Sequence, residues 1–211
     1  MADSDINGLP QAQSDYVDAT DELIIQKAGE TLVKKIQVDD LFGGWRDIFP
    51  IQFETGSGPS APTWTALTAN CYAWAFGVND EMWLTFHTDH DIKQSATMYQ
   101  HVHWTTSGTN VQPVRWEITT ISAAGHGAGV FGAETVLNLD GTPSGVALTH
   151  EVTEDATGIA TTLPDNMLIE RIKRVTNGGT DNTDTVFFLT ADIHYPTQMF
   201  STKNRNPNFY T

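Results

Sequence analysis

The chain of 211 residues carries 11 lysines and arginines against 26 aspartates and glutamates, which gives a formal net charge of -15. This acidity excludes nucleic acid as a partner bound by phosphate neutralisation, and no apolar run approaches the roughly 20 residues that cross a bilayer. The acidic first residues predict no export signal, and therefore folding in a cytoplasm. The lone Cys71 excludes an internal disulfide, and we expect it to be a small core residue.

Residues 1–40 are predicted to form an N-terminal arm. The first 22 residues hold six carboxylates and no basic residue, which is typical of a segment that orders only against a neighbour. The stretch from Glu22 to Val38 fits a hairpin or a helix about equally. Gly29 would cost a helix about 1 kcal/mol relative to alanine, which favours a hairpin across Lys27 to Glu30.

Residues 39–50 combine several aromatic side chains with the pair Gly43-Gly44. This density of rings, which includes Trp45 and Phe49, predicts a compact loop that covers the end of a sheet. Residues 54–63 contain glycine, proline and serine and are predicted to be a loop.

From Trp64 onward, short β-like runs alternate with turn signals, as expected of an antiparallel sandwich or barrel. Runs 71–76 and 80–87 flank Gly77-Val78-Asn79 and are predicted to pair as a hairpin. Further strands are predicted at 98–104, 111–122, 134–139, 145–153, 167–175 and 184–195. Since no repeat or long helical period is present, we predict an all-β chain with a single antiparallel, jelly-roll-like β-sandwich over residues 41–195.

The last predicted strand alternates from residue 184 to 195, with Phe187, Leu189, Ala191, Ile193 and Tyr195 on one face. Pro196 is expected to end its ladder, because proline lacks a donor. Residues 196–211 carry no period but end on aromatic residues, which predicts a docking tail. The predicted interface residues, chosen as aromatic anchors or their neighbours, are Trp45, Phe49, Phe200, Pro207, Phe209 and Tyr210.

His101 and His103 stand two residues apart on a predicted strand, so both side chains point to one face and could ligate one metal ion. His87 and His194 are the other candidates for such a site. However, cupin sandwiches place a glutamate three or four residues after this pattern, where this chain has Thr106, Ser107 and Gly108. A metal site is therefore not the preferred interpretation, and no cofactor or catalytic set is predicted.

The preferred interpretation is a polar sheet face, on which charges of both signs pair across strands and could face a symmetry-related copy. Its members fall opposite the apolar sets of their strands: His101, His103, Arg115, Glu117, Asp192 and His194, together with His87, Arg171 and Lys173.

Several motifs in this order resemble a family of virion structural proteins of tailed bacteriophages, described as head decoration, head fibre or tail-associated proteins. The motifs are Gly44-Trp45-Arg46-Asp47, residues 81–91, His101-Val102-His103-Trp104, Val114-Arg115-Trp116-Glu117, Gly125-His126, Asp192-Ile193-His194-Tyr195 and residues 202–210. The resemblance covers roughly residues 41–211. It implies a jelly-roll-like sandwich on a virion, without enzymatic activity.

We therefore expect a capsid decoration or cement protein of a virion that is assembled in the host cytoplasm. Its expected partners are the major capsid protein and copies of itself, as a dimer or trimer, without nucleic acid or membrane. The first alternative is a head- or tail-fibre protein that binds a receptor or glycan, with Trp64, Trp74 or Trp83 stacking on sugars. The second is a cupin-like metalloenzyme.

Overall fold

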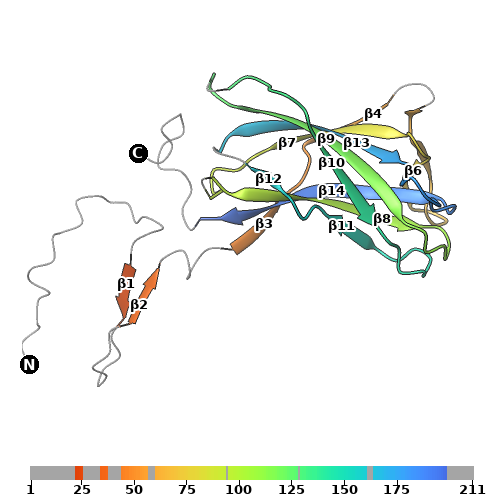
Figure 1. The fold of residues 1–211 in the computed structure, drawn as a ribbon, viewed down its shortest axis with the longest axis horizontal. Helices are drawn as coiled ribbons and strands as arrows, with labels where there is room; N and C mark the ends of the chain where they lie inside the picture. Colours follow the sequence, from red (N-terminus) through yellow and green to blue (C-terminus); the bar gives the residue numbers. More distant parts are fainter. Residues whose placement is uncertain are drawn as a thin grey trace, which may run out of the picture.

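The computed structural model describes residues 22–25, 34–37, 44–56, 60–93, 95–127, 129–160 and 164–198. Within these ranges the chain is built of antiparallel strands and contains no α-helix (Figure 1). No helix that could span a membrane occurs in this part of the chain. The prediction of an all-β sandwich is therefore confirmed.

One layer of the sandwich is a five-stranded sheet. In spatial order its strands are β10 (Thr135–Gly141), β9 (Val114–Ala124), β13 (Asn166–Val175), β7 (Glu81–His87) and β4 (Gln52–Thr55). All neighbouring pairs are antiparallel.

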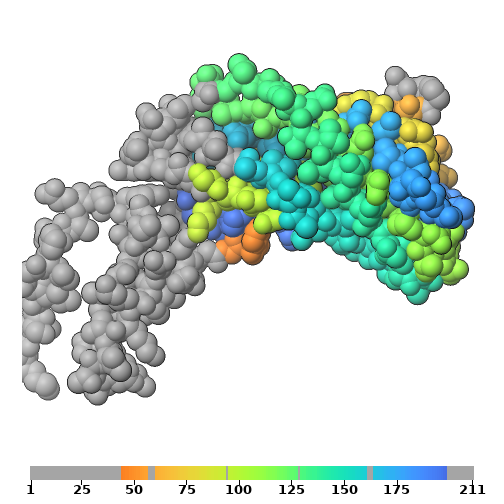
Figure 2. Space-filling model, in the orientation of Figure 1, coloured from red at the N-terminus to blue at the C-terminus, as the bar shows by residue number. Residues whose placement is uncertain are grey.

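The other layer has seven strands, in which the long strands β8 (Thr97–Thr106) and β14 (Val186–Thr197) lie side by side. The remaining members are β11 (Glu151–Glu154) and β12 (Ile159–Ala160) beside β8, β6 (Tyr72–Phe76) and β3 (Gly44–Ile48) beside β14, and β5 (Thr63–Ala66) beside β6. Figure 2 shows β3, in orange, next to the dark-blue end of β14.

The N-terminal strands β1 (Glu22–Ile25) and β2 (Lys34–Gln37) pair antiparallel with each other and form a separate two-stranded sheet. This pairing agrees with the predicted hairpin rather than the helix. The turn between them, the rest of the arm and the tail 199–211 lie outside the described residues.

The core lies between the two sheets and follows the alternation of the sequence. Met82, Leu84 and Phe86 of β7 are fully buried, as their shared face predicted. Phe76, Trp116 and Phe188 form an aromatic cluster in this core, which also buries Trp104. Its ring centroids lie 5.4 Å apart for Phe76–Trp116 and 5.6 Å apart for Phe76–Phe188, within the range of favourable edge contacts.

Two predictions for β14 are wrong. A β-bulge at Leu189 shifts its register against β8, so that Val186 and Phe188 face the core before the bulge, whereas Ala191, Ile193 and Tyr195 face it afterwards. Leu189 itself is exposed. The ladder also continues through Pro196, which pairs with Trp45 of β3, and the Pro196 carbonyl accepts a hydrogen bond from the Lys93 amide at 3.0 Å.

The connection between β6 and β7 does not form a hairpin. The two strands belong to different sheets, and the turn at residues 77–80 carries the chain across the sandwich.

Residues 44–48 form a strand rather than a capping loop, because β14 offers them a free edge. The strand predicted at 145–153 is reduced to β11, since Gly145 and Leu148 have positive φ angles of 78° and 60°. Cys71 is exposed and not in the core.

Candidate functional site

Four strands of the seven-stranded sheet, with His150 just before β11, bring together a set of imidazoles and carboxylates on the outer face, opposite the core residues Val102 and Trp104. We call this set the histidine cluster: Asp47, His101, His103, His150, Glu154, Asp192 and His194. The strand registers place its members opposite one another, as in the pairs Asp192–His101, Glu154–His101 and His194–Asp47.

His101 lies at the centre of the cluster. Its Nε2 forms a hydrogen bond of 2.6 Å with Glu154 Oε2, and its Nδ1 lies 3.3 Å from Asp192 Oδ1. The ring of His194, which is paired with Asp47, lies 3.9 Å from the ring of His101 between centroids. The His101 ring is therefore held between carboxylates on two neighbouring strands.

His103 continues the same arrangement along β8. Its Nε2 forms a 2.8 Å hydrogen bond with Asp192 Oδ2, and its Nδ1 forms a 2.8 Å bond with His150 Nε2. Asp192 thus lies between the two imidazoles of β8. It is only 2% exposed, so its oxygens depend on these neighbouring side chains and not on solvent for their contacts.

A hollow lined by Trp45, Tyr99, Glu154 and His194 lies beside the cluster. Trp45 and Tyr99 approach each other at 5.7 Å between ring centroids, and Trp45 lies 6.5 Å from His194. A molecule that reaches the cluster from this side therefore passes over the rings of Trp45 and Tyr99.

β3, which carries Trp45, is fastened by a hydrogen-bonded group on the neighbouring loop. Tyr195 Oη donates to Asp91 Oδ1 at 2.8 Å, and Arg46 Nη1 donates to Asp91 Oδ2. Burial, together with the hydrogen bond to Asp91, raises the pKa of Tyr195 well above its ordinary value. Tyr195 therefore remains a hydrogen-bond donor at every ordinary pH.

The predicted polar face is divided between the two outer faces of the sandwich. His101, His103, Asp192 and His194 come together as the histidine cluster, whereas Arg115 and Glu117 lie on β9 of the other sheet. His87 also lies on that sheet, where His87 and His126 contact the two oxygens of Asp165 at 2.8 and 2.7 Å.

The sequence pattern alone does not bring Asp47, His150 and Glu154 into this set. Asp47 falls in a segment whose composition predicts a loop, and the strand predicted at 145–153 ends before Glu154. The alternation of residues 151–154 could have indicated a short strand, but its pairing with β8 is not visible in the local sequence.

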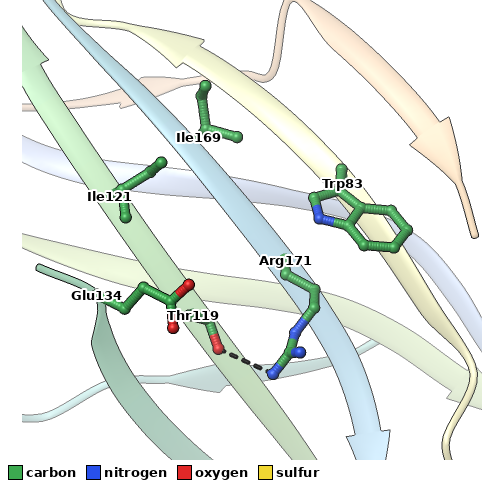
Figure 3. Close-up of a pocket in the computed structure, with 6 residues that line it drawn as sticks. All are labelled: Trp83, Thr119, Ile121, Glu134, Ile169 and Arg171. Atoms are coloured by element: carbon green, nitrogen blue, oxygen red, sulfur yellow. Dashed lines mark hydrogen bonds between the residues drawn. The ribbon is translucent and has the colours of Figure 1, made fainter. Parts of the chain in front are cut away.

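On the five-stranded sheet, a hollow surrounds Arg171 (Figure 3). It is lined by Trp83, Thr119, Ile121, Glu134, Ile169 and Arg171. Arg171 Nη2 donates to Glu117 Oε1 at 2.6 Å and to Thr119 Oγ1 at 3.1 Å, the second of which is drawn in Figure 3. Because Glu117 already neutralises the guanidinium, this hollow is a poor site for an anion.

A third hollow is aromatic and is lined by Phe53, Trp64, Tyr72, Ala73, Trp74, Phe188 and Leu189. The rings of Trp64 and Tyr72 stack at 6.2 Å with an interplanar angle of 22°, and Trp64 lies 4.9 Å from Trp74. Trp64 is 55% exposed, so part of its indole ring is open to solvent.

Two of the predicted interface residues can be placed. Trp45 is 59% and Phe49 56% exposed, and Ile51 and Phe53 in the same segment are also exposed. Phe200, Pro207, Phe209 and Tyr210 lie outside the described residues.

No known family model matches the chain, and no curated protein is significantly similar to it. Among solved structures, a chain from infectious bursal disease virus Gt strain matches with a TM-score of 0.34 and 11% identity, over 90% of this chain and 40% of that chain. A chain from the Gx strain matches with a TM-score of 0.33 and 11% identity, over 84% and 37%. A carbohydrate-binding module specific for non-crystalline cellulose matches with a TM-score of 0.27 and 12% identity, over 68% and 83%.

This chain thus spans less than half the length of the viral chains that it matches. At these TM-scores the likenesses carry no argument about function. The resemblance to a tailed-phage family stays a prediction.

Proposed function

We propose that the protein is a structural component of a bacteriophage particle, a decoration protein that binds the outer surface of the capsid and stabilises it. Its partners on this proposal are the major capsid protein and copies of itself, as a dimer or trimer. It has no catalytic role on this proposal, and its site of action is the virion.

The observation that carries the proposal is the exposed apolar segment of residues 45–53. Trp45, Phe49, Ile51 and Phe53 are each between 46% and 67% exposed. Single exposed apolar residues are common on monomers, but four within nine residues of the sequence, on the edge strands β3 and β4 and the link between them, are an unusual concentration for a chain that acts alone. Aromatic side chains bury much area at a low entropic cost, which makes Trp45 and Phe49 suitable contact anchors.

The hairpin of β1 and β2 supports the same proposal. A two-stranded hairpin is only marginally stable by itself in water. Among the described strands, β1 and β2 pair with each other and with no strand of the sandwich. A neighbouring subunit would supply the packing that this hairpin needs, and such bridging contacts collect binding energy over many copies.

The experiment is a binding measurement on purified capsids with the full chain and the variant Phe49→Ser. We expect Phe49→Ser to lower occupancy at least tenfold without changing the melting temperature, because the side chain is exposed. Val130→Ser is the matched control, since Val130 is 87% exposed on a loop outside the segment. Equal occupancy of the Phe49→Ser and Val130→Ser variants would refute the role of this segment.

A second candidate function is glycan binding, which the aromatic hollow favours. The exposed part of the Trp64 ring beside the stacked Tyr72 could pack against the apolar face of a sugar ring. Glycan arrays discriminate between the two candidates, because a decoration protein gives no signal on them. A signal that Trp64→Ala abolishes would favour the fibre protein instead.

A further inference from the structure

We propose that the histidine cluster binds one divalent transition-metal ion of the zinc class through His101 Nδ1, His103 Nε2 and the Asp192 carboxylate. These three residues offer ligand atoms that all lie within 4.8 Å of one another. Two imidazoles and a carboxylate are a ligand set that suits such ions and leaves at least one coordination position open.

The distances around Asp192 fit a single ion. Asp192 Oδ1 lies 3.3 Å from His101 Nδ1, and Asp192 Oδ2 lies 2.8 Å from His103 Nε2. Ligands about 2.0 to 2.1 Å from a tetrahedral zinc ion are separated by about 3.3 Å. The His101 contact already has this spacing, whereas the 2.8 Å contact of His103 would lengthen by about 0.5 Å when an ion binds.

An unsatisfied oxygen supplies independent support. Among the described residues, no donor forms a hydrogen bond with Asp192 Oδ1, although Asp192 is only 2% exposed. Its contact with His101 Nδ1 at 3.3 Å is an ion pair without hydrogen-bond geometry, and a buried carboxylate oxygen that accepts no hydrogen bond is costly and requires an explanation in a folded protein. A cation at the proposed position satisfies it.

The contacts on the far sides of the imidazoles orient them for a metal. The hydrogen bond of His101 Nε2 with Glu154 requires the proton on Nε2, because an ionised carboxylate only accepts. The Nδ1 lone pair of the neutral ring then points toward Asp192. For His103, the same rule places a proton on Nε2 in the hydrogen bond with Asp192 Oδ2, so an ion at this position replaces that proton, and an Nδ1 proton donated to His150 then keeps the ring in place. Metal-binding histidines are typically oriented by such outer partners.

Two other triads lie within the cluster, namely His101–Glu154–His194 and Asp47–Asp192–His194. We assign the ion to His101, His103 and Asp192 because His101 and Asp192 are both buried and their strands pair directly. Glu154 and Asp47 are exposed, so water can satisfy both carboxylates.

The experiment titrates the full chain, freed of metal by a chelator, with zinc chloride in a calorimeter and in a melting assay. We expect one zinc ion per chain and a rise in melting temperature of about 5 °C or more at saturation, reversed by chelator. Asp192→Asn, which keeps the shape of the side chain, should weaken binding at least tenfold, and His103→Asn should do the same. His87→Asn is the matched control on the opposite sheet and should bind like the unaltered chain.

Cobalt(II) in place of zinc provides a second readout, since its visible spectrum reports nitrogen and oxygen ligation directly and is expected to disappear in Asp192→Asn. The absence of one-to-one zinc binding by the unaltered chain would overturn the proposal. So would binding that survives both Asp192→Asn and His103→Asn. Loss of binding in His194→Asn with retention in His103→Asn would overturn the assignment of the ligands.

Discussion

Glu170 of β13 is a carboxyl group in the centre of the sandwich, fully buried between the sheets. Gln100 Nε2 and Thr120 Oγ1 both donate to its Oε1, whereas its Oε2 has no partner among the described residues. Burial raises the pKa of Glu170 to about 8, and the two hydrogen bonds offset only part of that rise. Glu170 is therefore protonated in the folded chain at neutral pH.

This raised pKa predicts a loss of stability with rising pH. The folded chain keeps a proton that the unfolded chain releases above a pKa of 4.5, so the free energy of unfolding falls as pH rises from about 4.5 to about 8. Glu170→Gln should remove this dependence on pH. Its free energy of unfolding should exceed that of the unaltered chain by a few kcal/mol at pH 8.5 and nearly equal it at pH 4. Urea unfolding at several pH values measures these free energies. A constant difference between the two chains across this pH range would contradict the prediction.

Arg174 connects the two sheets at one end of the sandwich. Its Nη1 donates to the Phe76 carbonyl and its Nη2 to the Asn182 carbonyl, both at 2.7 Å, and burial lowers its pKa. Arg174→Met leaves both carbonyls without their donors and should cost about 3 kcal/mol of stability. Lys173→Met on the opposite face of β13 is the control. Chemical denaturation that shows equal losses for the two variants would contradict this role.

Among the elements, those whose alternation is uninterrupted were predicted best from the sequence. Strands β7, β8 and β9 bury the faces that their spacing indicates, and the same spacing placed His101 and His103 side by side. The features that the sequence did not predict depend on pairing between segments that are distant in the chain. The bulge at Leu189 is hidden because a leucine continues the apolar pattern, and the contacts of Glu154 depend on the register of β11 against β8.

The bulge in β14 predicts that the fold tolerates the deletion of one residue from a central strand, namely Leu189. If Leu189 is deleted, Val186, Phe188, Ala191 and the later core residues of β14 alternate without interruption, so the same side chains still face the core. We expect the deletion variant to fold with a loss below about 2 kcal/mol, because Leu189 itself is exposed. Deletion of Phe187 is the control, since it moves Val186 to the outer face. Thermal melting that shows the two deletions to be equally damaging would contradict the role of Leu189 as the inserted residue.

At the scale of the whole molecule, a rigid all-β body presents an apolar segment at residues 45–53 and carries a separate hairpin on its N-terminal side. The net charge of -15 on the whole chain is unfavourable for binding nucleic acid through its phosphates. These features are consistent with a chain that attaches to other proteins through local apolar contacts. The histidine cluster is a separate feature of the same body, and its test is independent of the virion proposal.

The most direct test of the virion proposal is quantitative mass spectrometry of particles purified on density gradients from cells that produce this chain. We expect the unaltered chain in many copies per particle. The double variant Trp45→Ser with Phe49→Ser should be depleted at least tenfold, although it folds and is produced equally. Absence of the unaltered chain from intact particles, or equal copy numbers for both chains, would contradict the proposal.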